Sequence, residues 1–137
     1  MDILCSPTAD RDEVYTAMFK LREIGREVVP RLLSVVDDEG LGPGARARAV
    51  ELLGDLGGAE AVPVLVRLLK SAGVQVRWTA ATVLGRLGDR SALPALREAQ
   101  ADGGALEVAP GFVLRVADAA VSALARLESA GQPRPLT

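Results

Sequence analysis

The 137-residue sequence contains no histidine and one cysteine, Cys5. Histidine is the commonest general base and a frequent metal ligand, so its absence removes the usual centre of acid–base and metal chemistry. Cys5 cannot form an intrachain disulfide, and no histidine is present to activate its thiol. The paired carboxylates fall near expected helix ends and loops, where solvated acids are ordinary. The sequence therefore predicts no enzyme, no cofactor and no metal site.

Long apolar runs and an excess of one charge are also missing. No run approaches the roughly 20 apolar residues that cross a bilayer, and the N-terminus has no basic and apolar export signal. The 16 basic and 18 acidic residues give a formal charge of −2, which provides no overall attraction for nucleic acid or anionic membrane. We therefore expect a cytoplasmic protein without membrane contact, for which nucleic acid is a disfavoured partner.

Aromatic residues are only 3% of the chain, although hydrophobic residues make up 49%. The core must therefore consist of leucine, valine and alanine, and small alanine side chains favour close packing of helices. A chain of this length suits one domain that buries roughly two thirds of its unfolded surface.

The clearest pattern is a repeated pair of amphipathic helices. The sequence of residues 74–102 predicts two helices joined by a turn at Gly88 and Asp89. Residues 45–71 show the same pattern of residue types. Leu21, Leu53 and Leu84 stand at equivalent positions of successive units and are almost evenly spaced. Their spacing falls within the period that is typical of helical solenoids. Gly85 is expected to permit close helix approach and Gly88 a left-handed turn.

The repeats define the expected organisation of one domain with about seven helices. The step from Leu84 to its equivalent Leu124 is longer than the step from Leu53 to Leu84, so the last unit contains an insertion, which is rich in glycine and proline. The predicted segments are repeats at about 10–40, 44–72 and 74–102, a loop at 103–112, a final helix at 113–129 and a disordered tail at 130–137.

The segment VRWTAATVLGRLGDRSALPAL, from Val76 to Leu96, resembles the short HEAT-like repeats of the phycobilisome lyase type, which also build many small bacterial proteins. The resemblance covers about residues 12–129. It implies an all-α fold, a right-handed α-solenoid of HEAT-like helical hairpins. The first helix of each pair would lie on the convex side, and the second helices would line the concave side.

Helical spacing around the prolines of the second helices shows which side chains face outward. With the geometry that the resemblance implies, these side chains form the floor of the concave face. Their charges are mixed and several are small, which suits a protein or peptide better than a phosphate backbone. The candidate partner-binding residues are Arg31, Ser34, Val64, Arg67, Lys70 and Glu98.

A second candidate contact comprises Trp78, Leu106 and Phe112. Trp78 lies beside the buried stripe of its helix, so it is either a local cover over Ala47 or an interface anchor. Leu106 and Phe112, with Val108, either cap the third unit or form a contact site.

Arg46 and Arg77 lie near the start of the first helix of their repeats, at the edge of the buried stripe. Each is expected to pair with a carboxylate or a helix end of a neighbouring unit, which would hold the repeats in register. Asp89 is the leading candidate for such a carboxylate.

These features favour a non-enzymatic scaffold that binds a protein partner on the concave face. A nucleic-acid-binding HEAT-like module is an alternative, which Glu98, Asp37 and the negative net charge disfavour. A bilin lyase or chaperone is a further alternative, implied by the resemblance alone. A homodimer is a further alternative, because the unpaired last helix and the apolar Ile3 and Leu4 leave edges that can associate.

Overall fold

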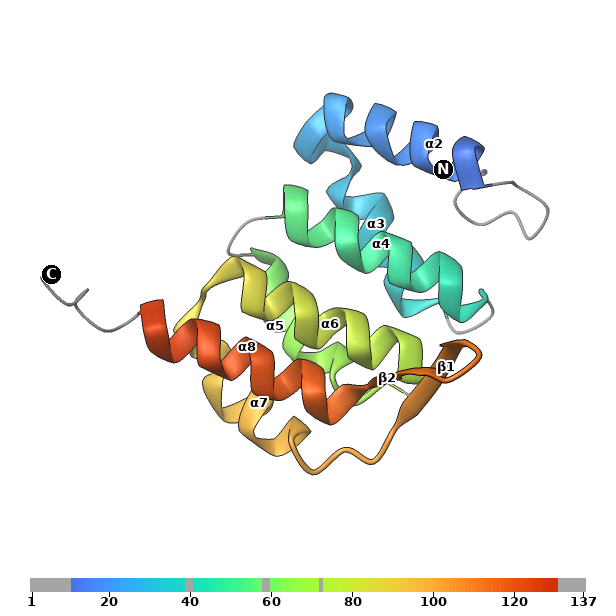
Figure 1. Ribbon diagram of the computed structural model, residues 1–137. Helices are drawn as coiled ribbons and strands as arrows, with labels where there is room; N and C mark the ends of the chain where they lie inside the picture. The colour runs from blue at the N-terminus through green and yellow to red at the C-terminus, as the bar shows by residue number, and fades with distance from the viewer. Residues whose placement is uncertain (1–10, 39–40, 58–59, 72, 131–137) are drawn as a thin grey trace, which may run out of the picture.

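A computed structural model describes residues 11–38, 41–57, 60–71 and 73–130. Within these ranges the chain forms seven α-helices, two short 3-10 helices and one pair of β-strands (Figure 1). The helical elements are α2 (Arg11–Ile24), η1 (Gly25–Val28), α3 (Val29–Asp37), α4 (Pro43–Leu56), α5 (Ala61–Leu68), α6 (Val74–Leu87), η3 (Arg90–Ala92), α7 (Leu93–Ala99) and α8 (Val116–Ala130).

The helices form two layers. Helices α2, α4, α6 and α8 follow one another side by side in the first layer, and α3, α5 and α7 form the second (Figure 1). Each second-layer helix packs against the first helix of the next unit, as α3 does on α4 and α7 on α8. This arrangement confirms the predicted all-α solenoid of helical hairpins.

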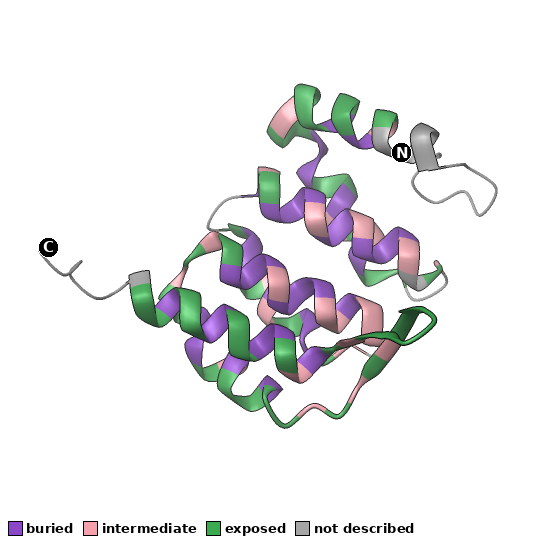
Figure 2. Cartoon of the chain, in the orientation of Figure 1, coloured by how far each residue is buried: buried purple, intermediate pink, exposed green. Residues whose placement is uncertain are grey.

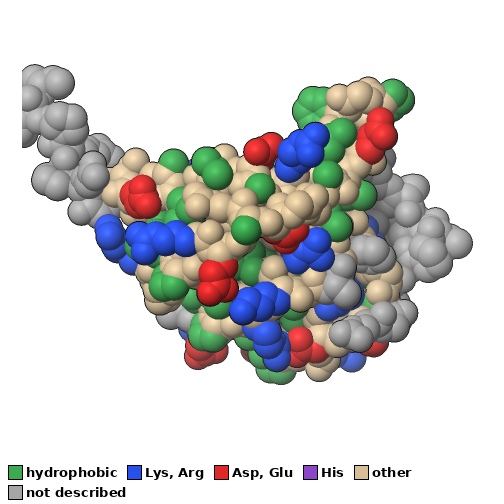
Figure 3. Space-filling view, turned by 90° about the horizontal axis from the view of Figure 1, so that it is seen from below, with side chains coloured by type: hydrophobic (Ala, Val, Ile, Leu, Met, Phe, Trp, Pro, Cys, Tyr) green, Lys and Arg blue, Asp and Glu red, His purple; other side chains and the backbone are tan. Residues whose placement is uncertain are grey.

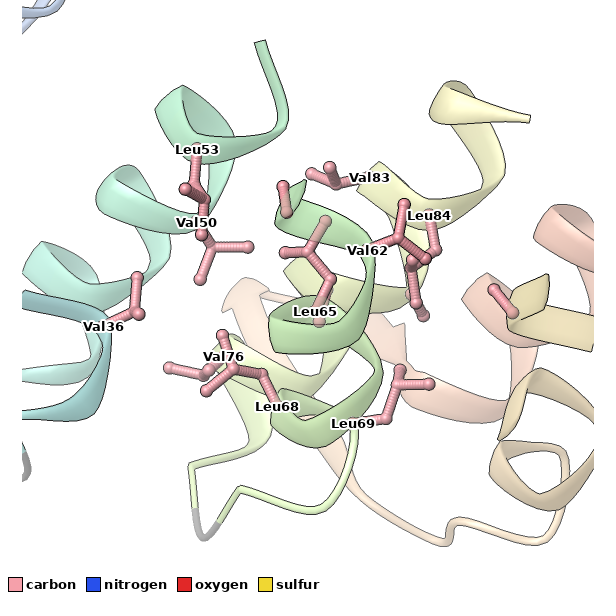
Figure 4. Close-up of a cluster of buried hydrophobic side chains, with 14 of the residues drawn as sticks. Val36, Val50, Leu53, Val62, Leu65, Leu68, Leu69, Val76, Val83 and Leu84 are labelled. Atoms are coloured by element: carbon pink, nitrogen blue, oxygen red, sulfur yellow. The ribbon is translucent and has the colours of Figure 1, made fainter. Parts of the chain in front are cut away.

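The core lies between the two layers and is aliphatic. Buried residues of each helix face the neighbouring helices, while exposed residues cover the outside (Figure 2). Side chains from α3, α4, α5 and α6 point toward one another around Leu65 (Figure 4). The largest fully buried side chains are Leu32, Leu52, Leu53, Leu65, Leu84, Leu96, Leu127, Val36, Val50, Val76 and Val83. Burial of this aliphatic stripe in every unit holds the stack together.

Glycines permit the close approach of first-layer helices. A Cβ atom at Gly85 would lie 2.7 Å from Cα of Ala123 in α8, and one at Gly54 would clash with Cγ1 of Val83 in α6. Gly88 ends α6 with φ at +74°, in the left-handed region. Both predicted glycine roles in the third unit are therefore present.

The insertion differs from the predicted loop at 103–112. It forms an antiparallel β-hairpin of β1 (Ala105–Ala109) and β2 (Phe112–Arg115), in which Leu106 pairs with Leu114. Pro110 and Gly111 make the turn between the strands, and Gly111 has φ at +77°. The Pro-Gly pair strongly predicts a turn. The strands on either side of it are so short that their alternating pattern was not recognised in the sequence. Helix α8 begins at Val116 rather than at 113.

Two predicted segments, one at each end of the chain, fall outside the described ranges. The predicted N-terminal segment with Ile3, Leu4 and Cys5 lies outside the described residues, and so does the predicted tail beyond Ala130. The predicted second helix of the first unit starts as the 3-10 turn η1 before α3. No helix in the described ranges combines the length and apolar character needed to span a membrane.

Candidate functional site

The predicted partner-binding residues lie on the second-layer helices. Arg31 and Ser34 are exposed on α3, and Glu98 is exposed on α7. Arg67 is exposed near the end of α5 and Lys70 in the turn that follows, whereas Val64 is half-buried and packs partly against the core. Figure 3 shows acidic and basic side chains interspersed on the face seen from below.

Two ion pairs join neighbouring second-layer helices. Arg67 Nη2 lies 2.7 Å from Asp37 Oδ1, and Lys70 Nζ lies 3.5 Å from Glu98 Oε2. Both pairs run diagonally from one helix to the next, because these long side chains reach one turn along the neighbouring helix. All four side chains are exposed, so each pair contributes roughly 0–1 kcal/mol. The alternating charges form no continuous basic strip of the kind that follows a phosphate backbone.

Arg46 binds the end of a helix in the preceding unit, as predicted. Its side chain is only 8% exposed, and its Nε and Nη2 donate to the carbonyl oxygen of Val36 at 3.0 and 2.8 Å. Val36 lies in the last turn of α3, where carbonyl groups lack intrahelical donors. The interaction fixes α4 against α3.

Arg77 donates to a carboxylate of its own unit and to a carbonyl at the end of the preceding unit, and the carboxylate is not the one predicted. Its Nε donates to Asp102 Oδ2 at 2.7 Å, and its Nη1 donates to the carbonyl of Ser71 at 2.8 Å. Asp89 instead accepts a hydrogen bond from the backbone N–H of Ser91 at 2.9 Å and so caps η3. The prediction of Asp89 was wrong because a residue at a helix N-cap directs its carboxylate to its own helix.

The Arg77–Asp102 pair is largely removed from solvent, with both side chains 17% exposed. Burial by itself raises the pKa of Asp102. Hydrogen bonds from Arg77 and from the backbone N–H of Gly104, together with the charge of Arg77, outweigh burial and leave the pKa below its ordinary value. The pair fixes the point where the chain leaves α7 for the hairpin.

A cleft of about 670 Å³ lies between the end of α5, the start of α6 and α7. Its walls are mostly apolar, with charged groups of both signs among them. It is lined by Val66, Leu69, Lys70, Ser71, Arg77, Pro94, Ala95, Glu98, Ala99, Ala101 and Asp102. Among the described residues, no group of three or more acidic or thiol side chains could hold a metal ion.

This cleft was not predicted, although the aligned repeats contain a signal for it. The cleft wall on α7 and the turn after it includes three alanines that stand where the preceding unit has larger side chains. In the alignment that pairs Leu53 with Leu84, the larger residues Val64, Leu68 and Lys70 correspond to Ala95, Ala99 and Ala101.

Trp78 and the hairpin meet on the opposite side of α6. Trp78 is half-buried, packs partly against the core and lines a recess of about 150 Å³ with Ala47. Leu106 and Leu114 line the same recess, while Phe112 at the tip of the hairpin is 62% exposed. The hairpin therefore brings two of the three residues of the predicted second contact together and leaves Phe112 projecting.

A family model for HEAT repeats matches residues 29–109, more than half of the chain. The chain belongs to the HEAT-repeat family. A search of curated proteins found no match. The match to the HEAT-repeat model confirms the family that the segment from Val76 to Leu96 predicted.

Among solved structures, this HEAT-repeat chain is similar to the complex of CpcE and CpcF of phycocyanin lyase from Nostoc sp. PCC7120. The TM-score is 0.64 at 27% sequence identity, and the match covers 93% of this chain. It covers 52% of the other chain, so the present chain spans about half the length of that structure's subunit. This likeness to a lyase contradicts the prediction that the protein is no enzyme. The lack of histidine argues only against histidine-based chemistry.

Proposed function

We propose that this HEAT-repeat chain is a lyase-type subunit that handles the bilin chromophore of a phycobiliprotein. The observation that carries the proposal is the likeness to the phycocyanin lyase complex, which extends over 93% of the chain at 27% identity. The large cleft beside α7 supports it, because small-molecule sites are usually concave and largely apolar.

A transfer reaction tests this function. The purified chain is incubated with a bilin and a phycocyanin subunit that lacks its chromophore, alone and with CpcE or CpcF in turn. Covalently bound bilin is then detected by fluorescence in a denaturing gel. We expect chromophore transfer above the protein-free control in at least one mixture. No transfer in any mixture, while CpcE and CpcF together are active, would contradict the proposal.

We further propose that the subunit works with a protein partner, a second HEAT-repeat chain. The similar structure is a complex of two subunits. The second-layer face offers that partner Arg31, Ser34, Val64, Arg67, Lys70 and Glu98, a mixed surface of the kind found in protein interfaces. A homodimer and a cytoplasmic location stay predictions from the sequence.

Exchanging one ion pair tests the partner-binding face. In the double variant Asp37→Arg with Arg67→Asp, the ion pair and the net charge are kept while the local charge pattern is reversed. We expect association with CpcE or CpcF, measured by light scattering, to weaken by about tenfold, because like charges then meet across the interface. Unchanged association of a correctly folded variant would place the interface elsewhere.

A further inference from the structure

We infer that the cleft between α5, α6 and α7 holds the linear tetrapyrrole and that the ammonium group of Lys70 binds one of its propionate carboxylates. The inference rests on the proposed function and assigns its ligand site.

The size and walls of the cleft suit such a ligand. Its volume of about 670 Å³ lies within the roughly 300–1,000 Å³ of typical small-molecule sites. Val66 and Leu69 on one side and Pro94, Ala95 and Ala99 on the other present apolar atoms. A linear tetrapyrrole has a long apolar ring system and two carboxylates, so it needs an apolar cleft with a cation at its margin.

Lys70 is the cation that can exchange its partner. Its ammonium lies 3.5 Å from Glu98, and the two side chains are 79% and 69% exposed. An exposed pair of this kind contributes little, so a ligand carboxylate can replace Glu98 at low cost. A carboxylate bound at the margin of an apolar cleft is also less hydrated than Glu98, which strengthens its pairing with Lys70.

Arg77 has a different role in the same cleft. Its guanidinium is engaged by Asp102 and by the carbonyl of Ser71, and its side chain is 17% exposed. Breaking a largely buried pair is costly because it leaves a charge without its partner. Arg77 therefore stays in the cleft wall and positions the end of α5 against α7.

The experiment is a titration of the full chain with biliverdin, followed by visible absorbance and by quenching of Trp78, the only tryptophan. We expect Lys70→Gln to weaken biliverdin binding about tenfold, since charged hydrogen bonds are among the stronger polar contacts. Lys70→Arg should retain affinity within about threefold, because it keeps the charge. Ala95→Phe, which fills the cleft without changing its charge and leaves Trp78 as the only tryptophan, should also weaken binding.

Arg97→Gln is the matched control, because it removes one positive charge from an exposed residue of α7 that does not line the cleft. It should bind biliverdin as the unaltered chain does. The dimethyl ester of biliverdin tests the carboxylate itself and should bind the unaltered chain and Lys70→Gln equally. Circular dichroism confirms that each variant is folded.

Failure of this inference is distinguishable from failure of the proposed function. If the chain binds biliverdin and Lys70→Gln and Ala95→Phe bind it as well as Arg97→Gln does, the cleft is the wrong site while the function stands. If the chain transfers chromophore but shows no biliverdin binding, the inference is overturned alone. If neither binding nor transfer occurs, both are overturned.

Discussion

At Gly85 the backbones of α6 and α8 come so close that a Cβ atom would lie 2.7 Å from Cα and 2.8 Å from Cβ of Ala123. Because the obstructing atoms belong to the helix backbone and its first side-chain atom, no rotamer change relieves the contact. We predict that Gly85→Ala lowers the free energy of unfolding by about 1–3 kcal/mol, as overpacking does in other cores. Urea denaturation measures the loss.

Gly103→Ala is the control for this substitution. Gly103 has open space around it and no positive φ, so the variant should stay within about 0.5 kcal/mol of the unaltered chain. Equal stability of Gly85→Ala and Gly103→Ala would show that α6 and α8 can separate without cost.

Asp102 gives the stability a dependence on pH. Its folded-state pKa is held below the ordinary value of 3.8, so its contribution is present above that value and is lost as pH falls through the folded pKa. We predict that Asp102→Asn destabilises the protein by about 1–3 kcal/mol at pH 7, because Arg77 is left partly buried without its counter-charge. The difference in the free energy of unfolding between the two proteins should become smaller as pH falls below 3.8. Urea unfolding at several pH values measures this difference, and a difference independent of pH would contradict the role given to Asp102.

At the scale of elements, the hairpin covers Trp78 with the apolar side chains of Leu106 and Leu114. We predict that Leu106→Ser with Leu114→Ser shifts the emission of Trp78 to longer wavelength and increases its quenching by acrylamide, because water reaches the indole. Val113→Ser is the matched control: Val113 points to the other face of β2, since side chains alternate along a strand. Identical spectra for all three proteins would show that the hairpin does not cover Trp78.

The helices could be predicted from the sequence, and the hairpin could not, for a physical reason. Helical units contain long stripes of buried leucine and valine that recur at an almost constant period, as Leu21, Leu53 and Leu84 do. Strands β1 and β2 have only five and four residues, and the turn signals of glycine and proline on either side of them dominate that segment. A short amphipathic strand beside two turns reads as a loop.

The candidate site was predictable in part. Outward positions on the second helices followed from helical spacing, and Arg46 reaches a helix end as predicted. The diagonal pairing of Arg67 with Asp37 depends on how neighbouring units are offset. The pairing of Arg77 with Asp102 rather than Asp89 depends on the path of the chain after α7 and on the use of Asp89 as an N-cap. The cleft depends on the same offset, which a single sequence does not define.

On the scale of the whole molecule, ion pairs tie neighbouring units together. Asp55 on α4 accepts hydrogen bonds from Arg22 on α2 at 2.8 Å and from Arg86 on α6 at 3.1 Å. Each repeat of a solenoid contacts mainly its neighbours, so such ties strengthen coupling along the stack. These side chains are 30–48% exposed, which limits each pair to about 1 kcal/mol or less.

We predict that Asp55→Ala loosens the first unit more than the rest of the protein. Hydrogen exchange should become faster in α2, which then loses its tie to α4, while amides of α7 and α8 change little. Glu51→Ala, on the same helix, is the control, since no ion pair of Glu51 is found in the part of the chain that the structure describes. A uniform rise in exchange along the whole chain would argue against local coupling.

The central claim is that this HEAT-repeat chain handles a bilin as a lyase-type subunit. Intact-mass spectrometry of the phycocyanin subunit after the transfer reaction tests it most directly. We expect a mass increase equal to one bilin when the chain is present, and a smaller modified fraction when Lys70→Gln replaces it. An unmodified phycocyanin subunit in every mixture that contains the chain, beside full modification by CpcE and CpcF together, would show that the chain is not a lyase-type subunit.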